Sequence, residues 1–176
     1  MTSESPRPID GPDPTLGPDG LLGAPEGWAD APSGLAGPIF WRTILAIESA
    51  RCARYRRPAT VVLAELVGLD RLAKRWGDDT ALQAVVTVAR VLRACGRTSD
   101  YVARLEVARF GMILTETDDV AAINFVERAR ERCERELRAA AEGVRVAFGW
   151  ASPSGSSTLL AATDQAETRL HAERAD

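Results

Sequence analysis

The pattern of hydrophobic and polar residues changes near residue 37. Residues 1–36 are dominated by Pro, Gly, Asp and Ser. Such a segment buries too little apolar surface to offset the entropy lost on ordering, so we expect a disordered tail. Leu21, Leu22 and Trp28 are its residues that could dock on a partner or on the domain. From residue 37 to 176, apolar residues recur with helix and strand periods, which predicts one domain.

The periodicities within this domain predict helices and strands in alternation. The run at 60–67 is continuously apolar and rich in β-branched residues, which is typical of a central strand buried on both faces. Elements with one apolar face pack most economically as an open sheet covered by helices, so we expect an α/β (α+β) fold. The predicted helices are 39–56, 69–76, 79 or 80 to 95, 117 or 118 to 141, and 158–173; the predicted strands are 60–67, 100–105, 109–114 and 143–150.

Composition and charge narrow the functional classes. The chain has 176 residues, of which 45% are hydrophobic, enough for one core. Its net charge of -3 is unevenly distributed. Residues 1–38 contain six carboxylates and one arginine, a net charge of -5, so the rest of the chain has a net charge of +2. A mildly basic domain suits a small anionic ligand or an acidic protein face, but it lacks the dense basic stripe of nucleic-acid binding.

Cysteine usage and hydropathy indicate a compartment. Cys52, Cys95 and Cys133 are odd in number and far apart, which is typical of buried thiols in a reducing cytoplasm. No basic segment followed by an apolar run marks a signal peptide, and no segment approaches the ~18 apolar residues of a membrane span. We therefore expect a cytoplasmic protein that binds neither membrane nor nucleic acid.

The most informative motif is a predicted hairpin. Asp100-Tyr-Val-Ala-Arg-Leu105 and Gly111-Met-Ile-Leu114 flank five residues, and this arrangement resembles the hairpin of the diguanylate cyclase (GGDEF) family, where the five residues are Gly-Gly-Asp/Glu-Glu-Phe. Three further segments resemble the family in the same order: Asp30-Ala-Pro-Ser-Gly-Leu, Ala53-Arg-Tyr-Arg-Arg-Pro58 and Val146-Ala-Phe-Gly-Trp-Ala. The resemblance implies the family's mixed central sheet with an antiparallel hairpin, related to the palm of class III cyclases.

The family joins two GTP molecules, and the resemblance implies a site with carboxylates for two divalent metals. Glu65 stands at the family's first metal-binding Asp, so one ligand survives in lengthened form. Ala108 replaces the second metal carboxylate and Arg109 the Glu that follows it. A cation at this position repels Mg²⁺, so we expect no bound metal and no cofactor.

The rest of the implied nucleotide site is also altered. Glu106 and Val107 replace the two glycines that let bare backbone approach the phosphates, and only Phe110 keeps the family residue. The guanine-reading Asn-Asp pair of the family falls on Ala73 and Lys74, which offer no matching acceptors. The resemblance therefore implies a degenerate member without cyclase activity.

One family element survives, namely Arg97-Thr-Ser-Asp100, five residues ahead of the altered turn. It resembles the family's inhibitory Arg-x-x-Asp site for cyclic di-GMP, in which the Arg contacts a guanine and a phosphate and the Asp accepts from the guanine. A structural interpretation is equally open, because Asp100 is a natural turn residue and Arg97 a natural residue at a helix C-terminus.

The leading hypothesis is a cyclic di-GMP receptor that uses Arg97 and Asp100 and signals to an unknown partner protein. A second is an interaction module that binds no nucleotide and uses the tail or the turn at 106–109 as a contact. The third is a residual cyclase or another nucleotidyl transfer using Glu65 with Glu106. A homodimer stays open in each case.

Overall fold

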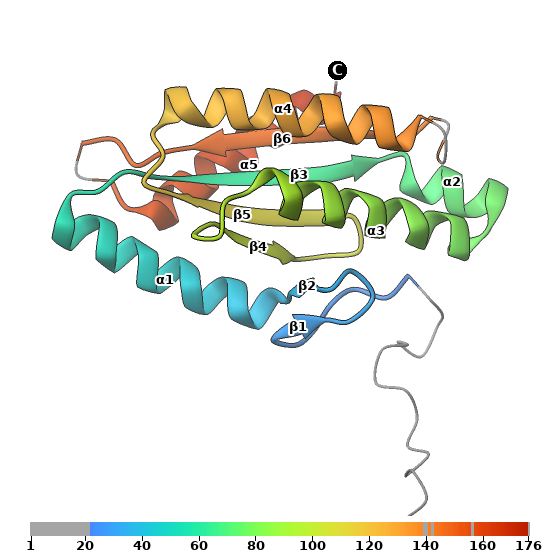
Figure 1. Cartoon of the computed structure of the whole chain (residues 1–176), viewed down its shortest axis with the longest axis horizontal. Coiled ribbons are helices and arrows are strands. Elements are labelled where there is room, and N and C mark those ends of the chain that lie inside the picture. The colour runs from blue at the N-terminus through green and yellow to red at the C-terminus, as the bar shows by residue number, and fades with distance from the viewer. Residues whose placement is uncertain (1–21, 139–140, 142, 156, 176) are drawn as a thin grey trace, which may run out of the picture.

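The computed structural model describes residues 22–138, 141, 143–155 and 157–175. They form a six-stranded sheet with helices on both faces (Figure 1). The elements in chain order are β1 (Ala29–Asp30), β2 (Leu35–Ala36), α1 (Pro38–Tyr55), β3 (Ala59–Val67), α2 (Leu69–Trp76), α3 (Asp78–Cys95), β4 (Tyr101–Arg104), β5 (Arg109–Thr115), α4 (Asp119–Leu137), β6 (Arg145–Ala151) and α5 (Leu159–Ala175).

The strand order is β1-β2-β4-β5-β3-β6. Strands β2 and β4 are parallel, and every other neighbouring pair is antiparallel. The predicted mixed sheet with an antiparallel hairpin is therefore confirmed.

The sheet is centred on β3, which pairs with β5 on one side and β6 on the other. Because side chains alternate across a strand, Val62 and Ala64 pack with α3 and α4, whereas Val61 and Leu63 pack with α1 and α5. All four are essentially inaccessible to solvent. This explains the continuous apolar run and confirms the predicted central strand.

Helix ends follow the predicted signals with two exceptions. Gly77 ends α2, and its positive φ of 88° turns the chain directly into α3, which begins at Asp78 with no side-chain cap. The predicted cap at Asp79 or Thr80 is thus wrong, and the Thr80 hydroxyl donates to the Trp76 carbonyl instead. Helix α4 is capped by Asp118 as predicted but ends at Leu137, earlier than the predicted 141.

The N-terminal segment differs from its prediction. Composition predicts that residues 22–36 belong to a disordered tail, but in the structure they contain β1 and β2 and lie beside β4 (Figure 1). Asp30 is only 5% exposed and pairs with Arg104, which is completely buried. Composition could not reveal this contact, because the two residues are 74 positions apart. The described part of the domain thus begins well before 37, while the prediction for residues 1–21 lies outside the described residues.

Arg104 joins the N-terminal segment to the hairpin turn. Its Nη1 donates to both carboxylate oxygens of Asp30 at 3.2 Å, and its Nη2 donates to the carbonyls of Gly23 at 3.2 Å and Val107 at 2.9 Å. A buried charge is tolerated only when it is paired and hydrogen-bonded. Arg104 therefore fixes the turn that carries the candidate site.

Candidate functional site

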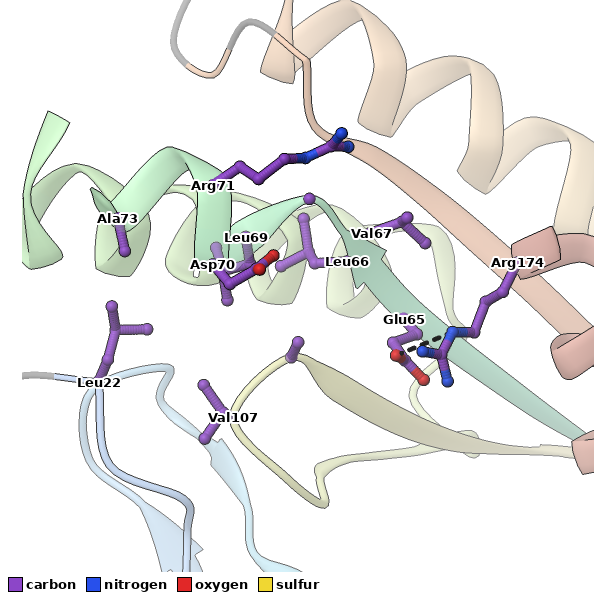
Figure 2. A pocket seen from close by; sticks show the side chains of 12 residues that line it. Leu22, Glu65, Leu66, Val67, Leu69, Asp70, Arg71, Ala73, Val107 and Arg174 are labelled. Atoms are coloured by element: carbon purple, nitrogen blue, oxygen red, sulfur yellow. Dashed lines mark ion pairs between the residues drawn. The ribbon is translucent and has the colours of Figure 1, made fainter. Parts of the chain in front are cut away.

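The hairpin turn between β4 and β5 lies at the end of β3 and is closed by ion pairs. Strand register places Arg109 directly beside Glu65. The Arg109 guanidinium donates to Glu65 Oε2 from Nε at 3.1 Å and from Nη2 at 2.9 Å. The second oxygen, Glu65 Oε1, lies 3.2 Å from Arg174 Nε. Figure 2 marks this ion pair with a dashed line. Both carboxylate oxygens of Glu65 are therefore engaged by guanidinium groups.

Two further carboxylates surround Arg109. Its Nη1 contacts Glu167 at 2.9 Å and Glu106 at 3.4 Å. Burial alone lowers the pKa of Arg109, but the hydrogen bond to Glu65 and the charges of Glu106, Glu65 and Glu167 outweigh it and raise the pKa. The guanidinium thus stays charged at any physiological pH.

The residues present do not fit a divalent metal. The Arg109 and Glu65 side chains are only 16% and 13% exposed, so little water screens their attraction. Within the described residues, no group of three or more His, Cys, Asp or Glu side chains is arranged to hold a metal ion. A metal at Glu65 would have to displace two guanidinium groups and then lie beside them.

The turn itself is built without glycine. The backbone N–H of Glu106 donates to the Arg109 carbonyl at 3.3 Å, and the N–H of Arg109 donates to the Glu106 carbonyl at 3.4 Å. None of the residues from Glu106 to Arg109 has a positive φ, so side chains are accommodated without strain. Val107 packs against the core and Phe110 is completely buried, which makes both structural residues.

A cavity of about 430 Å³ adjoins this turn. Figure 2 shows its mixed lining, with Glu65 and Arg174 at one end and Leu22 and Val107 at the other. Ala73 and Ala108 also line it, whereas Lys74 is exposed and does not. Of the two predicted guanine-reading positions, only Ala73 therefore lines the cavity, and its side chain is apolar.

Sequence reasoning missed Glu167 and Arg174 at this site, and it named Leu22 only as a residue that could dock on the domain. Glu167 and Arg174 come from α5, and Leu22 comes from the segment assigned to the tail. Their spacing carries no signal, because each reaches the turn only through the packing of elements far apart in the chain.

The Arg97–Asp100 turn lies at the opposite end of β4. Asp100 is 5% exposed, and its carboxylate faces inward. Its Oδ2 accepts from the backbone N–H of Arg97 at 2.7 Å, and its Oδ1 accepts from the backbone N–H of Thr115 at 3.1 Å. The carboxylate thus holds the turn against the end of β5.

The two arginines at this turn come from the turn itself, Arg97, and from the last turn of α3, Arg93. Arg97 and Arg93 are exposed, and the Arg93 Nη1 donates to the Asp100 carbonyl at 3.3 Å. The structure therefore keeps Arg97 beside Asp100, as the motif predicts, but gives the two side chains opposite directions. It brings neither of them near Glu65 and Arg109.

Comparison with known families agrees with this architecture. The family model described as diguanylate cyclase, GGDEF domain, matches residues 28–176. The chain belongs to the GGDEF family. This confirms the resemblance inferred from the hairpin, and the match begins within the segment that was assigned to the tail.

Curated relatives are larger proteins. The probable diguanylate cyclase DgcC of Escherichia coli K12 is 28% identical over 102 residues, which cover 58% of this chain and 28% of that protein. The diguanylate cyclase DosC of the same strain is 29% identical over 109 residues, covering 62% of this chain and 24% of that protein. This GGDEF domain thus matches only about a quarter of the length of these relatives.

Solved structures show the same fold. The GGDEF domain of DgcB from Caulobacter crescentus, in complex with c-di-GMP, has a TM-score of 0.78 at 17% identity, covering 85% of this chain and 91% of that one. The diguanylate cyclase SiaD of Pseudomonas aeruginosa, in complex with its activator SiaC, has a TM-score of 0.74 at 19% identity, covering 84% and 58%. At such identities the likeness establishes the fold alone. None of the described helices has the length and apolar character of a membrane span.

Proposed function

We propose that this GGDEF domain does not synthesise cyclic di-GMP and instead binds it as a receptor. The observation that carries the first half is the position of Arg109, which pairs with Glu65 and Glu167 where the family's reaction needs metal-binding carboxylates. Two-metal catalysis depends on anionic ligands that neutralise and position the ions. A charged guanidinium in their place repels the metal ion. The activation of a 3′-hydroxyl group that the metal would supply is then lost.

The receptor half rests on Arg97 and Arg93. Both guanidinium groups are exposed beside an ordered turn, and cyclic di-GMP offers two phosphates to such donors. Asp100 contributes by fixing the backbone of Arg97 through the 2.7 Å hydrogen bond. The structural neighbour DgcB is a GGDEF domain in complex with c-di-GMP, which supports the choice of ligand.

The first test is a cyclase assay. Incubation with GTP and Mg²⁺ or Mn²⁺ should give no cyclic di-GMP above a blank without protein. Turnover that disappears in Glu65→Ala would overturn the inactive assignment.

The second test is calorimetric titration with cyclic di-GMP, with GTP as the control ligand. A charge-assisted hydrogen bond is worth roughly 1.5–3 kcal/mol, so Arg97→Ala should weaken binding by about ten-fold or more. Arg135→Ala is the matched control, because Arg135 is an exposed arginine in the last turn of α4. Equal loss in both variants would indicate binding by general charge and not by this turn.

A second candidate function is a protein interaction module that binds no nucleotide. The observation that favours it is Asp100, whose two oxygens already accept hydrogen bonds from the fold, so that the Arg-x-x-Asp spacing has a structural explanation. Wild-type protein that gives no heat and no thermal shift at saturating cyclic di-GMP would select this function. The neighbour SiaD, in complex with its activator SiaC, illustrates a protein partner in this fold.

For either function, we propose that the protein acts in the cytoplasm. Cys52, Cys95 and Cys133 are all free thiols. Burial raises the pKa of Cys133 to about 12, so this thiol stays protonated and unreactive. Free thiols persist in a reducing compartment.

A further inference from the structure

The N-terminal segment forms one wall of the cavity that adjoins the hairpin turn. The side chain of Leu22 lines this cavity of about 430 Å³, opposite Ala73 of α2 and beside Val107 of the turn (Figure 2). All three residues are partly buried and pack against the same apolar core. Leu22 therefore closes the apolar end of the cavity. We call residues 22–25, which carry this side chain, the N-terminal strap.

A buried guanidinium anchors the N-terminal strap to the turn. Arg104 Nη2 donates to the Gly23 carbonyl at 3.2 Å and to the Val107 carbonyl at 2.9 Å. Pro25, at the other end of the strap, is buried. One donor group thus holds the strap and the turn together, and it sets the position of Leu22, which adjoins the anchored Gly23.

The strap is nevertheless built to separate from the domain more easily than the sheet. Residues 22–26 belong to no helix or strand, and Gly23 and Ala24 are exposed. Segments without the hydrogen bonds of a helix or a sheet ladder, and with few buried side chains, open at a small fraction of the free energy of global unfolding. Leu22 can therefore leave the cavity while the sheet stays folded.

The lining behind Leu22 combines apolar and cationic surface. Its apolar part includes the buried side chains of Leu66 and Leu69. Arg71 also lines the cavity and is exposed, whereas Arg174 is already paired with Glu65. An apolar hollow beside an exposed guanidinium suits a planar aromatic ring that carries an anionic group.

We propose that the N-terminal strap controls access to this cavity. With Leu22 in place the apolar end is closed, and an aromatic anion enters fully only when the strap moves away. The volume that remains beside Leu22 is at the low end of the roughly 300–1,000 Å³ of small-molecule pockets. The inference does not depend on the proposed receptor function, because the cavity and the Arg97–Asp100 turn lie at opposite ends of β4.

Fluorescence titration of the full chain with anilinonaphthalene sulfonate, a probe with aromatic rings and one sulfonate group, tests the inference. Leu22→Ala removes most of the side chain that closes the cavity. Binding of the probe should strengthen by about ten-fold or more, because apolar space opened by truncation accepts aromatic molecules. Adding Ala73→Leu to this variant refills the space from the opposite wall, and the double variant should bind the probe like the wild type.

Leu160→Ala is the matched control for the loss of a leucine side chain. Leu160 is 51% exposed on α5 and lies outside the cavity lining. Its truncation should leave probe binding unchanged. Melting curves of all the variants should stay cooperative, which excludes binding of the probe to a partly unfolded chain.

Four outcomes decide the inference. Stronger binding in Leu22→Ala that returns to the wild-type level in the double variant supports control by the strap. Equal binding in the wild type and Leu22→Ala overturns it. A gain that persists in the double variant places the new site outside the cavity and also overturns it. An equal gain in Leu160→Ala indicates general loosening of the fold and overturns it as well.

Discussion

The two ends of β4 use their arginines in opposite ways. At the turn end, Arg109 is surrounded by carboxylates and is largely buried. At the other end, Arg97 is exposed, Arg93 donates a single hydrogen bond to the Asp100 carbonyl, and the Asp100 carboxylate is turned into the fold. A guanidinium that is already paired has little interaction energy left for a ligand, whereas an exposed one exchanges only water. The capacity of a site to bind an anionic ligand thus depends on whether its arginines are already paired with carboxylates, and not on where the family has its catalytic centre.

The largest expected effect comes from Arg104, the residue that ends β4 and holds the turn. Arg104→Ala leaves the Asp30 carboxylate buried without its partner, and breaking a buried pair costs about 3–5 kcal/mol in the free energy of unfolding. For a domain of this size the melting temperature should fall by roughly 6–20 °C.

Truncation gives an independent measure of the same contact. Deleting residues 1–36 removes Asp30 and leaves Arg104 buried without it, so a similar drop is expected. Deletion of residues 1–21 is the control, because their composition predicts no contribution to the core. Equal melting temperatures for both deletions would contradict the role of residues 22–36.

Asp100 tests the inward half of the comparison. Asp100→Ala leaves the backbone N–H groups of Arg97 and Thr115 without their acceptor. Hydrogen bonds to a charged group contribute about 1.5–3 kcal/mol, so denaturant unfolding should show a loss of that order. An unchanged unfolding midpoint would mean that the carboxylate is available to a ligand after all.

Arg109 tests the closed end. Arg109→Ala removes the cation that Glu65, Glu106 and Glu167 share, while Arg174 still pairs with Glu65. We expect a loss of about 1–2 kcal/mol in the free energy of unfolding. We also expect calorimetry to detect no binding of Mn²⁺ by the wild type, in which Arg109 occupies these carboxylates. Mn²⁺ binding by the wild type would show that the ion pairs do not exclude a metal.

Arg97 should give the smallest change in stability. Its side chain is exposed, so Arg97→Ala should shift the melting temperature by no more than about 1–2 °C while it weakens cyclic di-GMP binding. A larger shift would place Arg97 in the fold and remove the contrast between the two ends of β4.

The sequence by itself determined the elements from α1 onward, the central strand and the family. The apolar run at Ala59–Val67, the glycine at 77 and the hairpin segments each carry a local signal, since periodicity and backbone preference act over a few residues. The proposed loss of the metal-binding pattern also rests on local sequence, because Ala108 and Arg109 are read directly from the motif.

Only the tertiary structure decided how the charges are paired. Asp30 meets Arg104 across 74 positions, and Glu167 and Arg174 approach Glu65 and Arg109 from the last helix. Such contacts depend on strand register and helix packing, which no local pattern encodes. The inward direction of the Asp100 carboxylate is also tertiary, because Thr115, one of its two backbone donors, belongs to the next strand.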